Sequence, residues 1–123
     1  ESDLVVALVP LTDSTRHMID AKALAAMKPG AVFINVARGK VMDEAAVVEA
    51  LRSGQLAGAG FDVFEEEPVV HSALFEMDQV VMTPHLGGAT EEERQIGRRE
   101  AAEEVARFLR GEPVRNPVNE PKR

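Results

Sequence analysis

Three side chains of this sequence, Arg38, Glu67 and His85, could together hold an organic anion and move a proton. The guanidinium of an arginine is a rigid fork of donors that suits a carboxylate. An imidazole can act as a general acid or base near neutral pH. A neighbouring carboxylate can orient the imidazole, as it does in catalytic triads. If these side chains meet, the sequence predicts acid–base chemistry on a small anion.

Each of these residues also has an ordinary structural explanation. Arg38 can be a surface arginine in a loop, and a single histidine such as His85 is more often structural than catalytic. The run Glu65–Glu67 is by itself typical of a solvated acidic loop. Asp62 can accept a hydrogen bond from a carboxamide or merely cap the next turn. These alternatives stay open for each residue taken alone.

The elements that must position these side chains are short strands alternating with helices. Continuous apolar runs predict parallel strands that are covered on both faces: Leu4–Val9, Ala31–Val36, Leu56–Phe61 and Val80–Met82. Helices are predicted over about 21–28, 44–53 and 91–110, after the N-cap residues Asp20, Asp43 and Thr90. This alternation predicts an α/β fold with a doubly wound parallel sheet.

The third predicted helix has the clearest local signals. Thr90 and Glu93 form a capping-box pattern, and Gly111 follows the last turn. An apolar stripe predicts one buried face, made of Ala102, Val105, Ala106 and Leu109. The tail 112–123 contains three prolines and is predicted to be extended or disordered.

The candidate residues all follow predicted strands. Ligands of open α/β sheets bind beyond the carboxyl ends of the strands, and parallel strands share that edge. We therefore expect the residues after the four strands to converge there: Pro10 and Thr15, then Ala37 and Arg38, then Asp62 and Glu67, then His85, Gly87 and Gly88.

Composition argues against several other classes of protein. The net charge is −7, and the one basic cluster, Arg94–Arg99, is interleaved with glutamates, so we expect no nucleic-acid partner. The chain has no cysteine and no metal-site spacing, and His17 and His71 are interpreted as structural. No apolar run is long enough to span a membrane, and no secretory signal is visible at the start, so we expect a cytoplasmic protein.

Taken together, these segments resemble the D-isomer-specific 2-hydroxyacid dehydrogenases, the group of phosphoglycerate, glyoxylate/hydroxypyruvate and D-lactate dehydrogenases. The matching motifs run in order through nearly the whole chain: Pro10-Leu11-Thr12 with Thr15, Lys28-Pro29-Gly30-Ala31, Asn35-Val36-Ala37-Arg38-Gly39, Gly60-Phe61-Asp62-Val63-Phe64, Glu67-Pro68, Thr83-Pro84-His85-Leu86-Gly87-Gly88-Ala89-Thr90 and Asn116-Pro117-Val118-Asn119.

The resemblance implies a role for each candidate residue. Arg38 would bind the carboxylate and keto oxygen of the substrate, His85 would be the acid/base, and Glu67 would hold His85 in the useful tautomer. The implied cofactor is NAD, with NADP as the alternative, and the residues implied to surround it are Pro10, Thr15, Ala37, Arg38, Asp62, His85, Gly87 and Gly88. Asp62 would contact the nicotinamide carboxamide. The implied reaction is hydride transfer between the nicotinamide and a small D-2-hydroxy or 2-keto acid.

The chain lacks two parts of the family pattern. The Gly-x-Gly-x-x-Gly turn and the ribose-reading acidic residue, which in the family lie upstream, are absent, as is the substrate domain. We therefore expect residues 1–111 to be the C-terminal half of a Rossmann-type NAD-binding domain, with helix 91–110 crossing toward the absent substrate domain and 112–123 as an extended tail. We expect this fragment alone to be inactive. Its unpaired strand edge favours self-association, and a homodimer is expected.

Two other functions remain as alternatives. The family resembles corepressors that use NAD as a structural ligand, and Arg38, Glu67 and His85 do not separate such a non-catalytic NAD-binding module from an enzyme. A doubly wound domain without chemistry is the second alternative. The formate dehydrogenase branch is disfavoured, because it resembles this sequence with Gln in place of Glu67.

Overall fold

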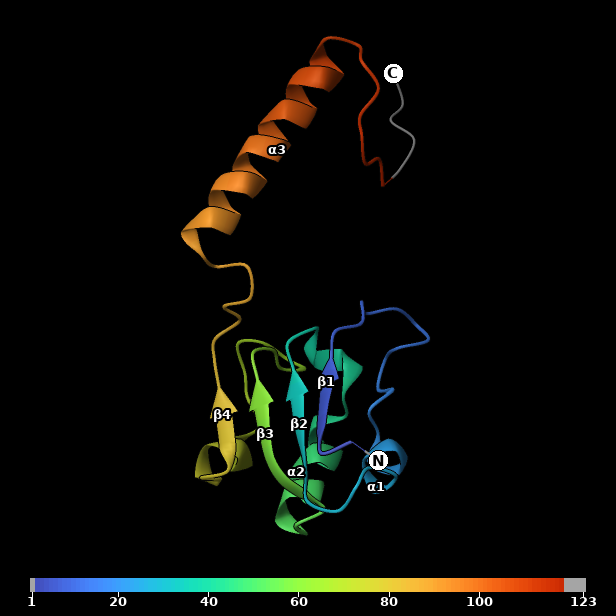
Figure 1. The fold of residues 1–123 in the computed structure, drawn as a ribbon, viewed down its shortest axis with the longest axis vertical. Helices are drawn as coiled ribbons and strands as arrows, with labels where there is room; N and C mark the ends of the chain where they lie inside the picture. The colour runs from blue at the N-terminus through green and yellow to red at the C-terminus, as the bar shows by residue number, and fades with distance from the viewer. Residues whose placement is uncertain (1, 119–123) are drawn as a thin grey trace. The chain divides into compact units, whose positions relative to one another are not determined.

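A four-stranded parallel sheet forms the centre of the first of two compact units in the chain (Figure 1). The computed structural model describes residues 2–118, with the first unit ending at Gly87 and the second beginning at Gly88. The strands lie in the order β1 (Leu4–Ala7), β2 (Ala31–Asn35), β3 (Leu56–Phe61) and β4 (Val80–Met82). The predicted Rossmann-like α/β class with a parallel sheet is thereby confirmed.

Helices connect the strands as the sequence predicts, although the first is shorter. Helix α1 spans Ala21–Ala25 and α2 spans Glu44–Arg52, each with its predicted aspartate as N-cap. The amide of Gln55 donates to the carbonyl oxygens of Leu24 and Met27, 3.0 Å each, and Pro29 disfavours helix at the residue before it. The 3-10 helices η1 (Gly39–Val41) and η2 (Ser72–Glu76) are additional short elements of the loops.

The core of this unit lies on the face of the sheet that α1 and α2 cover. Leu24, Val47 and Leu51 from the helices pack with Phe33 and Phe61 from the sheet, whose rings meet edge to face at 6.2 Å. The opposite face is less covered than the apolar runs predict. Its exposed residues include Leu4, Val6 and Val81, because the helices of this unit pack on the core face.

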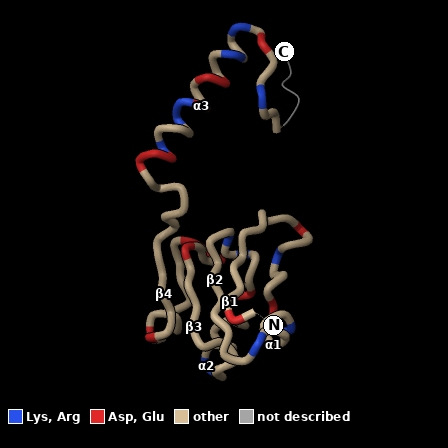
Figure 2. Tube along the Cα trace, in the orientation of Figure 1, with Lys and Arg blue, Asp and Glu red and all other residues tan. Residues whose placement is uncertain are grey.

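The second unit consists of α3 (Glu91–Leu109) and the tail that follows it. Thr90 caps the helix by accepting from Glu93 N at 3.2 Å, and Gly111 ends it with φ +75. Alternating charges cover the helix (Figure 2). None of its residues is buried, so the predicted apolar stripe is not covered within residues 2–118. No helix in those residues is long and apolar enough to cross a membrane.

The described part of the tail contacts α3. The guanidinium of Arg107 donates to the carbonyl oxygen of Pro113 at 2.9 Å, and Arg115 N donates to Glu104 Oε2 at 2.7 Å. Residues 119–123, and with them the last residue of the Asn116–Asn119 motif, lie outside the described residues.

Candidate active site

His85 and Glu67 form a hydrogen-bonded pair beyond the carboxyl ends of β3 and β4. His85 Nδ1 lies 2.8 Å from Glu67 Oε2, and Glu67 Oε1 accepts from Phe64 N at 3.0 Å. The histidine bond, followed by the Phe64 bond, lowers the pKa of Glu67 below its ordinary value of 4.5. With Nδ1 facing the carboxylate, the other ring nitrogen, Nε2, has no hydrogen-bond partner among residues 2–118. That nitrogen is available for proton transfer.

The backbone of His85 is held in a conformation that non-glycine residues seldom adopt. Its φ is +53, in the left-handed region that disfavours side chains with a Cβ. The N–H of His85 donates to the carbonyl oxygens of Asp62 at 2.9 Å and of Thr83 at 3.1 Å. Conformations of this kind persist where surrounding bonds over-determine them, and they cluster at functional sites.

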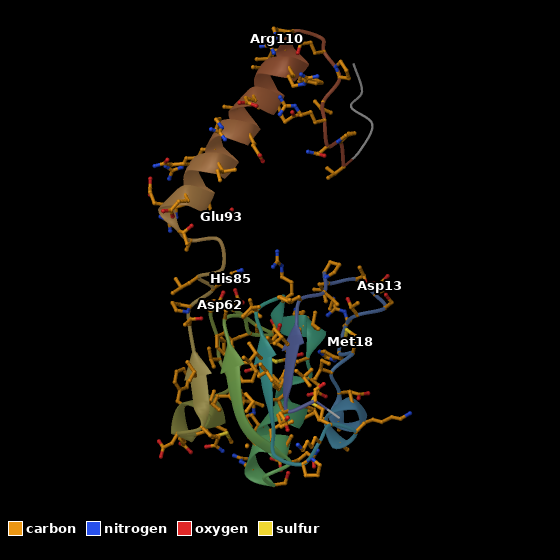
Figure 3. The ribbon with its side chains drawn as sticks, in the orientation of Figure 1. Asp13, Met18, Asp62, His85, Glu93 and Arg110 are labelled. Atoms are coloured by element: carbon orange, nitrogen blue, oxygen red, sulfur yellow. The ribbon has the colours of Figure 1, made fainter. Side chains whose placement is uncertain are left out.

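Asp62 is the second residue that fixes the histidine loop. It is 6% exposed, and its carboxylate accepts from Thr83 Oγ1, from Leu86 N at 2.7 Å and from Gly87 N at 2.8 Å. Burial by itself raises the pKa of Asp62, but these hydrogen bonds outweigh burial and hold it below 3.8. Asp62 and His85 lie together at this end of the sheet (Figure 3).

The run Glu65–Glu67 is not simply a solvated acidic loop. Each glutamate meets a base from a different part of the chain: Glu65 Oε1 contacts His17 Nε2, Glu66 Oε1 lies 3.0 Å from Lys40 Nζ, and Glu67 pairs with His85. His17, which we interpreted as structural, therefore forms a second His–Glu pair. The two partners are 48 residues apart in the sequence, so no local sequence pattern predicts their contact.

Most of the donors of the Arg38 guanidinium have no partner among residues 2–118. Its Nη1 donates to Ala37 O at 2.6 Å, and no carboxylate of the described residues forms an ion pair with it. Asn35 sets the turn before it, since the Asn35 amide donates to Arg38 O at 3.0 Å and accepts from Ala37 N at 3.1 Å. A guanidinium with free donors suits an incoming carboxylate.

The three candidate catalytic residues line the same cavity, which has a volume of about 320 Å³. It is lined by Arg38, Glu67 and His85, and also by Leu11, Gly39, Lys40, Phe64, Glu65 and Glu66. The sequence did not assign the other lining residues to the site: Leu11, Gly39, Lys40, Phe64, Glu65 and Glu66. Leu11 and Phe64 lie inside the motifs that carry the family resemblance, and Lys40 follows Arg38 by two positions.

A neighbouring cavity of about 510 Å³ lies beyond β1 and β2. Its lining includes Pro10, Ala37 and Arg38 of the expected cofactor residues, together with Leu8, Val9, Leu11 and Val36. Thr15 does not line it, but Thr15 Oγ1 donates to Pro10 O at 2.7 Å and so shapes its wall. The two cavities share Leu11 and Arg38.

The glycine pair divides between the two units. Gly87 closes the first unit, and a Cβ there would stand 3.2 Å from Asp62 Oδ2, so the residue type permits the close approach to the carboxylate. Gly88 begins the second unit with φ +76. Its backbone conformation favours glycine.

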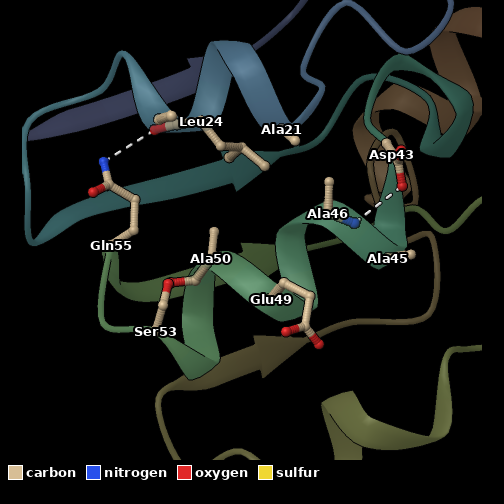
Figure 4. Close-up of a pocket in the computed structure, with 10 residues that line it drawn as sticks. Ala21, Leu24, Asp43, Ala45, Ala46, Glu49, Ala50, Ser53 and Gln55 are labelled. Atoms are coloured by element: carbon tan, nitrogen blue, oxygen red, sulfur yellow. Dashed lines mark hydrogen bonds between the residues drawn. The ribbon is translucent and has the colours of Figure 1, made fainter.

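A larger cavity, of about 630 Å³, lies between α1 and α2 and lacks a comparable set of reactive groups (Figure 4). Five alanines contribute to a lining that also contains Asp43, Glu49 and Gln55. Asp43 is engaged as the cap of α2 and Gln55 with the carbonyls at the end of α1. We therefore place the candidate site at the carboxyl edge of the sheet.

Known proteins are similar to this chain in both sequence and fold. Residues 1–87 match the family model described as D-isomer specific 2-hydroxyacid dehydrogenase, NAD binding domain. The glyoxylate reductase of Thermococcus onnurineus is 56% identical over 110 residues, which cover 89% of this chain and 31% of that protein. The chain spans about a third of the length of the glyoxylate reductases it matches and less than a quarter of the D-3-phosphoglycerate dehydrogenases.

Two solved structures show the likeness in three dimensions. The holo form of D-mandelate dehydrogenase from Rhodotorula graminis is 42% identical with a TM-score of 0.92, covering 97% of this chain and 35% of that one. A D-isomer specific 2-hydroxyacid dehydrogenase from Xanthobacter autotrophicus Py2, in complex with NADPH and MES, is 48% identical with a TM-score of 0.82, covering 96% and 48%. This chain therefore belongs to the D-isomer specific 2-hydroxyacid dehydrogenase family, within its NAD-binding domain.

Proposed function

We propose that the chain is the catalytic edge of an NAD(P)-dependent oxidoreductase that interconverts a small 2-keto acid and the D-2-hydroxy acid. The observation that carries the proposal is the shared cavity, which holds an arginine with free donors beside a histidine whose Nδ1 faces a carboxylate. The relatives' names support the class of substrate. Among 2-keto acids, glyoxylate is the first to test, because a glyoxylate reductase is among the relatives.

In the proposed reaction Arg38 binds the substrate carboxylate and steers the keto oxygen toward His85. Glu67 accepts the Nδ1 proton of His85 in a hydrogen bond, so the proton that is exchanged with the substrate is the second one, which the imidazolium carries on Nε2. During reduction Nε2 gives its proton to the keto oxygen, and during oxidation it takes the hydroxyl proton. A bound nicotinamide would supply or accept the hydride.

The cavity beyond β1 and β2 fits the nicotinamide end of the cofactor. Its walls combine the apolar side chains of Leu8, Val9 and Leu11 with the backbone around Ala37, and it adjoins Arg38. Asp62 Oδ2 accepts one hydrogen bond from the protein, which leaves an acceptor position for a carboxamide N–H. We assign Pro10, Thr15, Gly87 and Gly88 to the surroundings of the ring. No phosphate-binding glycine-rich loop occurs in residues 2–118.

The domain arrangement is part of the proposal. We assign residues 1–111 to the C-terminal half of the cofactor domain, with helix 91–110 leading toward a substrate domain and 112–123 as a tail. The exposed apolar residues Leu4, Val6 and Val81 support an upstream half that covers them. We further propose that the whole protein is a cytoplasmic homodimer, and that this chain alone is inactive.

The test is an assay of the full-length polypeptide, meaning this chain joined to an upstream cofactor half and a substrate domain. Oxidation of NADH and of NADPH is followed by absorbance with glyoxylate, hydroxypyruvate, pyruvate and phosphohydroxypyruvate, beside residues 1–123 alone. Turnover of one or more acids by the full-length polypeptide, with none by the isolated chain, supports the proposal. Binding of NADH without turnover of any acid would favour the corepressor-like module instead.

A further inference from the structure

Glu44 is a buried carboxylate that the proposed reaction does not use. It is the first residue of α2 and is 5% exposed. Acidic residues in the first turn of a helix complement its dipole, but they can do so while solvated. Burial of a charged group is costly unless hydrogen bonds compensate it, so the partners of Glu44 explain its position.

The carboxylate of Glu44 binds both flanks of the loop that carries Glu67. Oε1 accepts from His71 N at 2.8 Å, and Oε2 accepts from Glu65 N at 3.0 Å. Glu65 completes a reciprocal exchange, because its Oε2 accepts from Glu44 N at 3.4 Å. The segment 65–71 is therefore fixed at both ends to the first turn of one helix.

Between these two anchors the chain makes a narrow turn with Glu67 inside it. Val69 N donates to Glu66 O at 2.9 Å and closes the turn. His85 is held separately, through its N–H bond to the Asp62 carbonyl. The 2.8 Å contact between Glu67 and His85 thus joins two independently anchored segments, and movement of either Glu44 anchor would displace Glu67 from the imidazole.

We propose that Glu44 is a positioning residue that holds Glu67 in register with His85. This inference rests on the proposed function, in which His85 transfers the proton. Glu44 lines neither the cavity that contains Arg38 and His85 nor the one beyond β1 and β2. Glu44 acts through the loop 65–71, because each of its two carboxylate oxygens accepts a hydrogen bond from one backbone N–H of that loop.

The direct test is Glu44→Gln in the full-length polypeptide, with Glu49→Gln as the control. Glutamine keeps the size of the side chain but has one acceptor, so its NH₂ would face the N–H of Glu65 or His71. Glu49 lies on the same helix, and its side chain is 71% exposed. For Glu44→Gln we expect kcat to fall about tenfold, a part of the ~10²–10⁴-fold that a positioned acid or base contributes. The KM for the cofactor should not change.

A second readout follows the imidazole itself. The ¹⁵N chemical shifts of a labelled His85 ring distinguish a proton on Nδ1 from one on Nε2. Because the bond to Glu67 favours the proton on Nδ1, we expect that signature in the wild type and in Glu49→Gln, and its loss in Glu44→Gln. The signature does not require turnover, so it reports on the positioning role even if the polypeptide reduces no acid.

A second pair of variants removes one anchor from the loop side. His71 has φ −57, which proline also adopts, so His71→Pro deletes the donating N–H, and His71→Ala keeps it. We expect His71→Pro to reproduce the loss of the tautomer signature and His71→Ala to retain it. The proposal is overturned if folded Glu44→Gln and His71→Pro both keep the wild-type signature and kcat. The proposal is also overturned if the control Glu49→Gln loses the tautomer signature and kcat to the same extent as Glu44→Gln.

Discussion

Gly39 packs directly against the peptide group that follows Phe64. A Cβ at position 39 would overlap the Phe64 carbonyl and stand 2.5 Å from Glu65 N. Both neighbouring groups belong to the backbone, so they cannot make room for a Cβ by rotating a side chain. This contact joins the segment that carries Arg38 to the segment that carries Glu67.

Gly39→Ala should therefore separate the two halves of the site. We expect the free energy of unfolding to fall by about 1–3 kcal/mol, the usual cost of overpacking, and kcat/KM to fall as well. Gly60→Ala is the matched control, because a Cβ there would meet Ile34 Cγ1 at an ordinary 3.6 Å. Urea unfolding and steady-state kinetics of both variants measure the difference. Equal behaviour of the two variants would contradict the packing argument.

Replacement of Asp62 tests how the histidine loop is held. Asn at this position would present its NH₂ to one of the backbone N–H groups that the carboxylate now accepts. Since Asp62 is buried, we expect a loss of about 1–3 kcal/mol from the unsatisfied donor. Thr83→Val, which removes one of the three donors and leaves the carboxylate, should cost less. Thermal unfolding ranks the two variants, and the opposite ranking would refute the arrangement.

The sequence predicted the convergence of Arg38, Glu67 and His85 because it depends on topology. Each residue follows a strand, and the carboxyl ends of parallel strands meet at one edge. The role of Glu44 could not be predicted in this way. An acidic residue after an Asp cap is an ordinary helix start, and its buried contacts lie 21 and 27 residues away. The apolar stripe of α3 is predicted only from the helical spacing of its apolar residues. Such spacing indicates an apolar face but does not identify the segment that covers it.

The Glu67–His85 pair should make stability depend on pH in a defined direction. The pKa of Glu67 is lowered in the folded chain, so its contribution is fully present above the ordinary value of 4.5 and is lost as pH falls through the lower, folded value. The difference in unfolding free energy between wild type and Glu67→Gln should therefore shrink as the pH falls below 4.5. Urea titrations at a series of pH values measure it. A difference that grows on acidification would be incompatible with the pair.

Substitution of Arg38 tests recognition of the substrate carboxylate. Lys preserves the charge of Arg38 but not the planar fork of donors. We expect Arg38→Lys to lower kcat/KM for the acid by about 10–100-fold, the loss of one bidentate charged contact. Arg38 also lines the cavity assigned to the nicotinamide, but Lys keeps the charge there, so fluorescence titration with NADH should show a smaller change in Kd than the change in kcat/KM. If the variant kept full activity, the guanidinium would not be the group that binds the acid.

Proton transfer by His85 is the central claim, and the second His–Glu pair supplies its control. His17 pairs with Glu65 through Nε2, whereas His85 pairs with Glu67 through Nδ1, and in the proposed reaction His17 transfers no proton. The most direct measurement is single-turnover oxidation of NADH by the full-length His85→Gln and His17→Gln variants, with the best acid substrate at saturation. We predict a rate loss of about 10²–10⁴-fold for His85→Gln, the range typical of a general acid, and little loss for His17→Gln. Equal rates in the two variants, or an undiminished rate in His85→Gln, would contradict the account.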